Sequence, residues 1–211
     1  MIKYVSFDLD GTLADETFDH LMWNVEMPNL YAQTHNIDVK RAEEIVFAEY
    51  YKALYIEKIE NWVEVDYWFK RLKINDWQSM INNLKKHVSV YDDTFEILDY
   101  LKTKYKLIIV SSSNEQFIDI KLKSQGLAPY FENVFSSSSM YGKNKKDRSV
   151  FEDVLNQLKI KPSEMVHIGD SPFHDHSEPS TLGITSYLID RTKKKKGDYV
   201  IYSLRELKEV L

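Results

Sequence analysis

Two aspartates stand two positions apart near the start of the chain. Asp8 and Asp10 follow the apolar run Lys3–Phe7, and Gly11 comes next. Two carboxylates that face one point repel each other unless a cation offsets their charge, and a glycine at this place permits a tight backbone turn. Calcium loops use a similar spacing, but their further acidic ligands are absent here, because residues 12–14 are Thr, Leu and Ala. The segment therefore predicts a metal-binding turn of another kind.

A second acidic group follows a later apolar run, Met165–Ile168. Asp170 stands just after this run, and Asp175 lies five residues further on. Ligands of an open parallel sheet bind at the carboxyl ends of its strands, so both groups are expected at one edge of the sheet. Four carboxylates at one edge form an all-oxygen donor set, which suits Mg²⁺ better than zinc or copper. Zinc is the weaker alternative; it would use imidazoles from the same stretch, namely His167, His174 and His176.

Two segments between the acidic groups suit the binding of a phosphate. The run Leu107–Val110 leads into Ser111 and Ser112, which would bring hydroxyl and backbone N–H groups to the same edge. We choose Ser111 as the principal hydroxyl. Further along, a basic stretch precedes a helix around Phe151, where an ammonium could neutralise charge on a transferring group. The candidates are Lys143, Lys145 and Lys146.

The elements that must position these residues follow from the hydrophobic pattern. Short apolar runs without alternation indicate strands that are buried on both faces, as in a parallel sheet covered by helices. Segments of helical period separate the runs, so the predicted class is α/β. The predicted strands are Lys3–Phe7, Leu107–Val110, Asn133–Phe135, Met165–Ile168, Thr185–Ile189 and Tyr199–Ile201.

One stretch breaks the alternation of strands and helices. From about Glu16 to about Val88 the patterns are helical and rich in aromatic residues, and all four tryptophans lie there. We interpret this stretch as an inserted helical domain whose aromatic side chains mostly form its own core. Three early residues could face a substrate, although surface or core positions are the favoured interpretation: His20, Trp23 and Glu26.

Composition excludes several classes of function. The 211 residues carry a net charge of −5, so there is no overall positive field to hold nucleic acid. The chain has no cysteine, which excludes disulfides, thiolate nucleophiles and cysteine-ligated zinc. Charges interrupt every apolar run well before the roughly 18 residues that a membrane span needs, and no signal peptide is evident. We expect a soluble, cytoplasmic protein without a nucleic-acid or membrane partner.

Taken in order, the four segments resemble those of phosphatases of the haloacid dehalogenase (HAD) superfamily. That pattern is an Asp-x-Asp-Gly-Thr strand end, a Ser or Thr strand end, a Lys before a helix, and a Gly-Asp-Ser-x-x-x-Asp loop, and all four are present. The resemblance implies a Rossmann-like parallel sheet with an inserted α-helical cap. It assigns residues 1–15 and 89–211 to the catalytic core and 16–88 to the cap.

The resemblance also implies roles for individual residues. Asp8 would be the nucleophile that forms an aspartyl-phosphate, and Asp10 the general acid and then base. Mg²⁺ would bind Asp8, the backbone carbonyl of Asp10 and Asp170, with Asp175 as a ligand or as a group that orients one. Lys145 best matches the phosphate-binding lysine when counted back from the helix, with Lys143 and Lys146 as rivals, because the usual Gly-Lys-Pro spacing is not kept.

We therefore expect Mg²⁺-dependent hydrolysis of a small phosphorylated metabolite. Dehalogenases of the superfamily lack the second aspartate and the metal, so Asp10 disfavours that activity. A sugar phosphomutase would keep all of these residues and stays an alternative. A catalytically silent binding scaffold is a more distant one, since no carboxylate of the pattern is missing. The sequence does not indicate the identity of the substrate or the oligomeric state.

Overall fold

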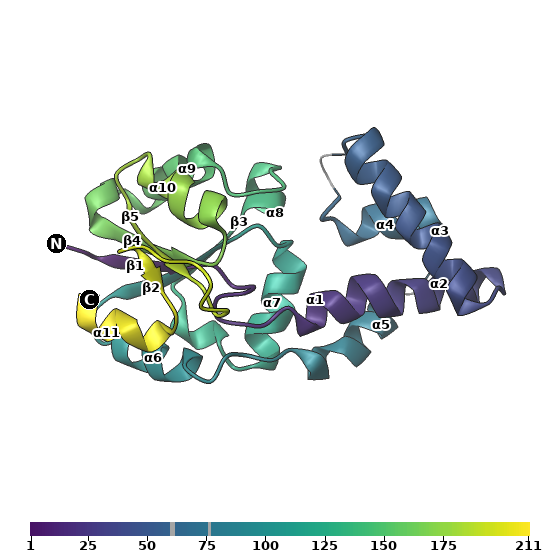
Figure 1. The fold of residues 1–211 in the computed structure, drawn as a ribbon, viewed down its shortest axis with the longest axis horizontal. Helices are drawn as coiled ribbons and strands as arrows, with labels where there is room; N and C mark the ends of the chain where they lie inside the picture. The colour runs from purple at the N-terminus through teal and green to yellow at the C-terminus, as the bar shows by residue number, and fades with distance from the viewer. Residues whose placement is uncertain (60–61, 76) are drawn as a thin grey trace. The chain divides into compact units, whose positions relative to one another are not determined.

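The computed structural model describes residues 1–59, 62–75 and 77–211. It divides the chain into two compact units (Figure 1). The first comprises Met1–Asp15 and Val90–Leu211, and the second comprises Glu16–Ser89. The second unit begins at Glu16, where the helical insertion was predicted to begin. It ends at Ser89, one residue after the predicted end at Val88. That these units act as a catalytic core and a cap stays a proposal.

The first unit is built on a six-stranded sheet in the order β3-β2-β1-β4-β5-β6, in which every neighbouring pair is parallel. The chain builds outward from β1 on one side through β2 and β3, and on the other side through β4, β5 and β6. The direction therefore reverses between β1 and β4, which is where open α/β sheets bind ligands. The strands are β1 (Tyr4–Phe7), β2 (Lys106–Ser111), β3 (Asn133–Ser136), β4 (Met165–Gly169), β5 (Thr185–Ile189) and β6 (Val200–Ile201).

Alternate residues of the central strands pack on opposite faces of the sheet, which explains their continuous apolar runs. One apolar cluster contains Val5, Phe7, Leu107, Ile109, Val166 and Ile168. The cluster on the other face contains Tyr4, Ile108, Val110 and Met165. The predicted α/β class and parallel sheet are thereby confirmed, and no strand end differs from the predicted one by more than a single residue.

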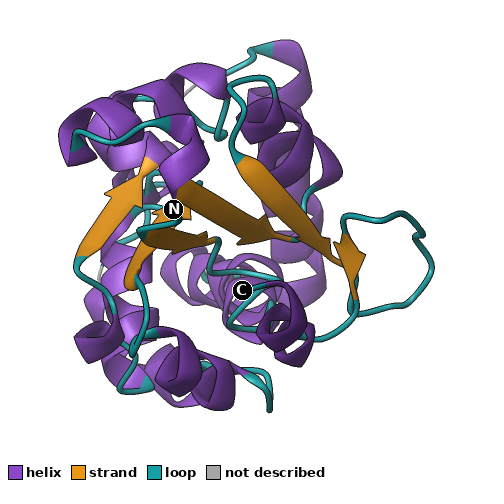
Figure 2. Ribbon diagram, turned by 90° about the vertical axis from the view of Figure 1, so that its left-hand side faces the viewer, coloured by secondary structure: helices purple, strands orange, loops and turns teal. Residues whose placement is uncertain are grey.

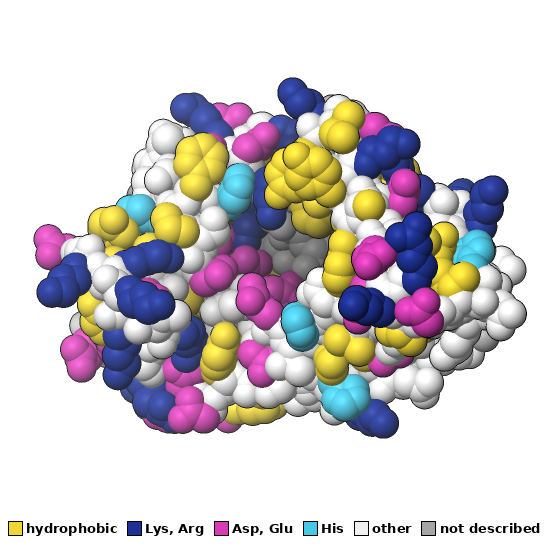
Figure 3. Space-filling model, turned by 45° about the vertical axis from the view of Figure 1, so that its right-hand side comes forward, with side chains coloured by type: hydrophobic (Ala, Val, Ile, Leu, Met, Phe, Trp, Pro, Cys, Tyr) yellow, Lys and Arg dark blue, Asp and Glu magenta, His cyan; other side chains and the backbone are white. Residues whose placement is uncertain are grey.

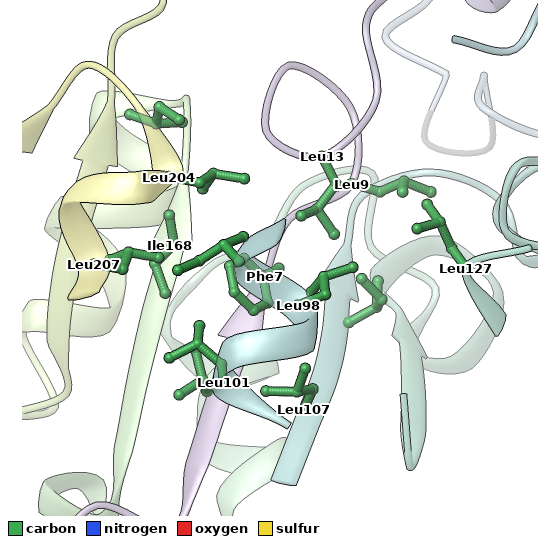
Figure 4. Packing of buried hydrophobic residues seen from close by; sticks show 14 of the residues in the cluster. Phe7, Leu9, Leu13, Leu98, Leu101, Leu107, Leu127, Ile168, Leu204 and Leu207 are labelled. Carbon is green, nitrogen blue, oxygen red and sulfur yellow. The ribbon is translucent and has the colours of Figure 1, made fainter. Parts of the chain in front are cut away.

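Helices cover both faces of this sheet (Figure 2). Helices α6, α7 and α11 supply residues to the cluster around Phe7, where Leu98, Leu101 and Leu207 lie close to Phe7 and Ile168 (Figure 4). Helix α9 contributes to the cluster on the opposite face. The helices of the first unit are α6 (Thr94–Leu101), α7 (Glu115–Ser124), α8 (Ser137–Tyr141), α9 (Arg148–Leu158), α10 (Glu178–Ser180) and α11 (Leu207–Val210).

All of the regular secondary structure among the described residues of the second unit is helical. Helix α4 buries residues at the spacing of one helical face, including Trp68 and Leu72. The ring of Trp68 meets those of Tyr50 and Trp23 edge to face, with centroids 4.6 and 6.5 Å away. These aromatic side chains therefore pack against one another within the unit. Its α-helices in the described residues are α1 (Thr17–Leu21), α2 (Met27–His35), α3 (Val39–Tyr51), α4 (Val65–Leu72) and α5 (Trp77–Leu84).

None of the helices in the described residues has the length and apolar character needed to cross a membrane.

On the face shown in Figure 3, lysine and arginine side chains are interspersed with aspartate and glutamate. This mixture of signs agrees with the small net charge of −5.

A buried ion pair ties the start of α6 to the segments that follow β1, β5 and β6. Arg191 donates to both carboxylate oxygens of Asp93, at 2.9 and 2.7 Å, and to the carbonyl oxygen of Thr12 at 2.6 Å. The Ser203 hydroxyl and the backbone N–H of Leu204 also donate to Asp93, at 2.7 and 2.8 Å. Asp93 is only 1% exposed, so these bonds replace its hydration. The pair fixes the loop that follows β1.

We expect Asp93→Ala to lower the free energy of unfolding by about 3 to 5 kcal/mol, because Arg191 would lose the partner of a largely buried charge. Burial raises the pKa of Asp93, but the hydrogen bonds from Arg191 and Ser203 outweigh it and hold the pKa below its usual value. The stabilisation by Asp93 should therefore be complete above the unfolded pKa of about 3.9 and disappear as the pH falls through the folded pKa. Urea unfolding at several pH values measures both effects.

Asp92 provides a matched control. Its side chain is 84% exposed and lies 3.4 Å from Arg205. Asp92→Ala should change the free energy of unfolding by no more than about 0.5 kcal/mol at any of these pH values. Equal losses in the two variants would contradict the importance assigned to the buried pair.

Candidate active site

Asp8 and Asp170 each directly follow one of the two strands at which the sheet reverses direction. Asp8 follows β1, and its backbone N–H donates to the carbonyl oxygen of Ile168 at 2.8 Å. Asp170 follows β4. Residues that are far apart in the sequence therefore meet at one sheet edge, as the sequence predicted, because β1 and β4 are paired in parallel register.

The turn after Asp8 is tight and depends on glycine. Gly11 has a φ of +73°, in the left-handed region, and its N–H donates to Ala14 at 2.8 Å. A Cβ atom at Gly11 would lie 2.6 Å from Oδ2 of Asp170. The missing side chain is therefore what allows the β1 turn and the Asp170 carboxylate to approach each other.

Three carboxylates converge at this edge. Asp8, Asp170 and Asp175 each offer an oxygen, and these oxygens lie within 4.8 Å of one another. Asp175 is completely buried and Asp8 is 8% exposed. Burial is the largest influence on the pKa of Asp8; Lys146 opposes it, Asp175 and Asp170 add to it, and the pKa rises to about 7. Negative charge at Asp8 is therefore costly without further positive charge.

Asp175 is held by the loop that contains it. Asp175 lies in the π-helical turn Pro172–Ser177, which Ser171 caps. Its Oδ2 accepts the backbone N–H of Ser171 at 2.9 Å. Burial raises the pKa of Asp175, but Lys146 and His167 more than compensate and bring it below its usual value. Asp175 is therefore ionised in this setting.

Lys146 supplies the positive charge among these carboxylates. Its Nζ lies 2.6 Å from Oδ2 of Asp8 and 2.5 Å from Oδ1 of Asp175, and the side chain is 2% exposed. Attraction to the two carboxylates outweighs burial and raises the pKa of Lys146, so the ammonium stays charged.

The choice of Lys145 is corrected by this geometry, which brings Lys146 to the carboxylates and leaves Lys145 at the exposed surface. The physical reason is how the segment before α9 is held. The Lys146 N–H donates to Oγ of Ser112 at 3.3 Å, and its carbonyl oxygen is 2.9 Å from Nδ1 of His174. Lys143, the other rival, bonds instead to Asp147, which caps α9, at 2.6 Å.

Asp10 has a different set of partners from Asp8. Its Oδ1 lies 2.5 Å from Nζ of Lys121, whose side chain is fully buried, and its Oδ2 accepts the hydroxyl of Ser113 at 2.6 Å. Neither residue was predicted from the sequence. A signal for Lys121 did exist, because it occupies the buried face of α7 together with Phe117 and Ile118.

The predicted phosphate-binding serines lie at the end of β2. Ser111 is buried, and its Oγ accepts the N–H of Ser113 at 3.1 Å. Ser112 bonds to the backbone of Lys146, as described above. Both are thus placed at the edge that carries Asp8, while their contact with a phosphate stays a prediction.

The donor set fits Mg²⁺ better than zinc. In residues 1–59, 62–75 and 77–211, the group of side chains close enough to share an ion consists of carboxylates alone. Three carboxylates beside one lysine leave an excess of negative charge, which a hard divalent cation would offset. The three histidines have separate partners: His167 bonds to Ser6 and Asp175, His174 to the Lys146 carbonyl oxygen, and His176 to Ser186.

The residues suggested for substrate contact in the insertion all belong to the second unit. His20 is exposed, and Trp23 and Glu26 are partly buried. Their contact with a substrate stays a prediction.

Comparison with known proteins places the chain in one family. A family model described as "Haloacid dehalogenase-like hydrolase" matches residues 5–189. The GMP/IMP nucleotidase YrfG of Escherichia coli is 25% identical over 171 residues, which cover 81% of this chain and 75% of the nucleotidase.

Solved structures agree with this placement. A HAD phosphatase from Thermococcus onnurineus superposes with a TM-score of 0.83 and 27% identity, over 99% of this chain and 97% of that one. YfnB from Bacillus subtilis, solved bound to magnesium, has a TM-score of 0.68 and 19% identity, over 100% and 98% of the two chains. The second likeness shows the fold alone.

Gly11→Ala should weaken the binding of Mg²⁺ by about 10- to 100-fold, because the new Cβ must push the Asp170 carboxylate away. Gly126→Ala is the matched control: its φ is +69° and no atom lies within 4 Å of the added Cβ. Both variants should lose about 1 to 2 kcal/mol of stability from the left-handed backbone. Isothermal titration calorimetry with Mg²⁺ separates the two effects, and equal affinities in both variants would contradict the steric argument.

Proposed function

Because the chain belongs to the haloacid dehalogenase-like hydrolase family, we propose that it is a Mg²⁺-dependent phosphatase that hydrolyses a small phosphate monoester through an aspartyl-phosphate. The observation that carries this proposal is the setting of Asp8. Its carboxylate is nearly buried at the point where the sheet reverses direction, beside Asp170, Asp175 and the ammonium of Lys146.

The relatives support the class of substrate. YrfG is named as a nucleotidase for GMP and IMP, and the chain from Thermococcus onnurineus as a phosphatase. We extend from them only the shared chemistry, which is the transfer of a phosphoryl group from a small phosphorylated metabolite to water.

Asp8 is the proposed nucleophile. Its Oδ1 accepts the N–H of Leu9 at 2.8 Å, which fixes the plane of the carboxylate. In the first step a carboxylate oxygen of Asp8 attacks phosphorus, a bond forms between them, and the bond from phosphorus to the ester oxygen breaks. In the second step water attacks the same phosphorus, and the bond to Asp8 breaks to release inorganic phosphate.

Asp10 is the proposed proton carrier for both steps. It donates a proton to the leaving alkoxide in the first step and takes one from the attacking water in the second. Lys121 and Ser113 each hold one of its oxygens, so the carboxylate is oriented before substrate arrives. These two residues act through Asp10 and are positioning residues.

Positive charge is the remaining requirement, because negative charge builds on the phosphoryl oxygens during transfer. Lys146 provides one fixed charge beside Asp8. Asp8, Asp170 and the backbone carbonyl of Asp10 would hold Mg²⁺, with Asp175 as a further ligand or as a group that orients one. The bound ion would supply additional charge for the phosphate oxygens.

The purified protein should release inorganic phosphate from members of a panel of phosphorylated metabolites when Mg²⁺ is present, and lose this activity in EDTA. Asp8→Asn should abolish turnover and leave the circular dichroism spectrum unchanged, because the amide is isosteric but is a poor nucleophile. Asp119→Asn, which changes an exposed carboxylate on α7, should retain full activity. Phosphate release from ester by Asp8→Asn would refute the mechanism.

The same assay separates hydrolysis from the phosphomutase alternative. In water enriched in oxygen-18, hydrolysis places the heavy isotope in the inorganic phosphate that is released. A mutase instead returns the phosphoryl group to a sugar, and its product contains no oxygen from water.

Asp10→Asn should slow turnover by about 10² to 10⁴, the usual contribution of general acid–base catalysis. With p-nitrophenyl phosphate the first step needs little help from an acid, since nitrophenolate is a good leaving group. The variant should therefore release a burst of nitrophenolate equal to the enzyme concentration and stall as phosphoenzyme, as seen in rapid mixing. An undiminished steady-state rate would remove Asp10 from its assigned role.

A further inference from the structure

A line of hydrogen bonds runs beneath the carboxylates from β1 to the loop after β4. Oγ of Ser6 lies 2.8 Å from Nδ1 of His167, and Nε2 of the same ring lies 3.0 Å from Oδ1 of Asp175. All three side chains are fully buried, with 0% exposure. The mechanism described above uses neither Ser6 nor His167, so their burial needs another explanation.

The backbone fixes both ends of this line. Ser6 and His167 are direct partners in the register of β1 and β4, at the centre of the sheet. The ring of Phe151, from α9, meets the His167 ring edge to face at 4.9 Å. The imidazole of His167, on β4, is thus held by its hydrogen bond to Ser6 on β1 and by contact with the ring of Phe151 on α9.

The chemistry of the three groups gives the bonds one direction. An ionised carboxylate only accepts, so Nε2 of His167 must carry the proton that it shares with Asp175. A neutral imidazole carries a single N–H, so its other nitrogen can only accept. Nδ1 then accepts, and the Ser6 hydroxyl must donate to it. Ser6 therefore selects the tautomer in which His167 donates to Asp175.

Asp175 has little freedom once these bonds form. Oδ1 is shared between His167 and Lys146, and Oδ2 accepts the N–H of Ser171. The carboxylate also sits directly over Gly169, where a Cβ would lie 2.2 Å from its Cγ. Without His167, only Lys146 would hold Oδ1, and Lys146 also serves Asp8.

We propose that Ser6 and His167 form a positioning pair that fixes the carboxylate of Asp175 for metal binding. Neither residue would touch substrate or metal. This inference rests on the Mg²⁺ site of the proposed function, and it adds that the site depends on a serine and a histidine that do not themselves bind the metal. Outer partners of metal-binding groups usually contribute about 10- to 100-fold in affinity or activity.

Calorimetric titration of the substrate-free protein with Mg²⁺ tests the pair without any catalytic assay. His167→Leu should weaken Mg²⁺ binding by about 10- to 100-fold, because Asp175 loses a donor. His167→Gln should recover much of this loss, since its amide N–H can take the place of Nε2–H. Ser6→Ala should weaken binding less than His167→Leu, because the ring remains but its tautomer is no longer selected.

Ser186→Ala is the matched control for Ser6→Ala. Ser186 is the partner of His167 in the register on the other side, on β5, and it is also buried, but its hydroxyl bonds to His176 and Ser180. The loss of a buried serine hydroxyl is therefore the same in both variants, and only Ser6→Ala should change the affinity for Mg²⁺.

The outcomes separate this inference from the proposed function. If the wild type binds Mg²⁺ and the His167 and Ser6 variants bind it equally well, the positioning pair is refuted while the metal site stands. Lower melting temperatures at unchanged Mg²⁺ affinity would mean a merely structural role and would refute it too. If the wild type itself binds no Mg²⁺, both the metal site and the pair are overturned. Should His167→Leu fail to fold, Ser6→Ala and His167→Gln still decide.

Discussion

Three carboxylates confined within 4.8 Å of one another repel, and the rest of this site is arranged around that repulsion. A single ammonium, that of Lys146, lies between Asp8 and Asp175 and partly offsets it. Burial, together with the repulsion that remains from Asp175 and Asp170, raises the pKa of Asp8 to about 7. Crowding of this kind is possible only where side chains are absent, and Gly11 and Gly169 lie where a Cβ would collide with Asp170 and Asp175.

Asp8 and Asp10 have different environments, although only Leu9 lies between them in the sequence. Asp8 is nearly buried among other carboxylates. The Asp10 side chain, in contrast, is 21% exposed and is bonded to Lys121 and Ser113. Each aspartate therefore has its own lysine, one from the segment before α9 and one from within α7. A fold that gives similar groups different surroundings can give them different chemical tasks.

The sequence predicted the sheet well and the details of the site only in part. Long-range order was accessible, because buried parallel strands produce uninterrupted apolar runs and because ligand-binding residues follow them directly, as Asp8 and Asp170 do. The choice between Lys145 and Lys146 was not accessible from spacing. It depends on which way an irregular segment turns, and that is decided by bonds to Ser112 and His174, which come from other parts of the chain. The contact between Lys121 and Asp10 was missed for the same reason, because the two residues lie 111 positions apart in the sequence.

The position of β1 in the middle of the sheet has a consequence for how the protein assembles. Tyr4, at the start of the chain, pairs with Lys106 on one side and with Met165 on the other. Closing loops of this length costs entropy before any contact repays it, so such pairings form slowly. During synthesis β1 gains its second neighbour only after β4 (Met165–Gly169) has been made. The acidic centre, which needs both β1 and β4, therefore cannot assemble before β4 has been made.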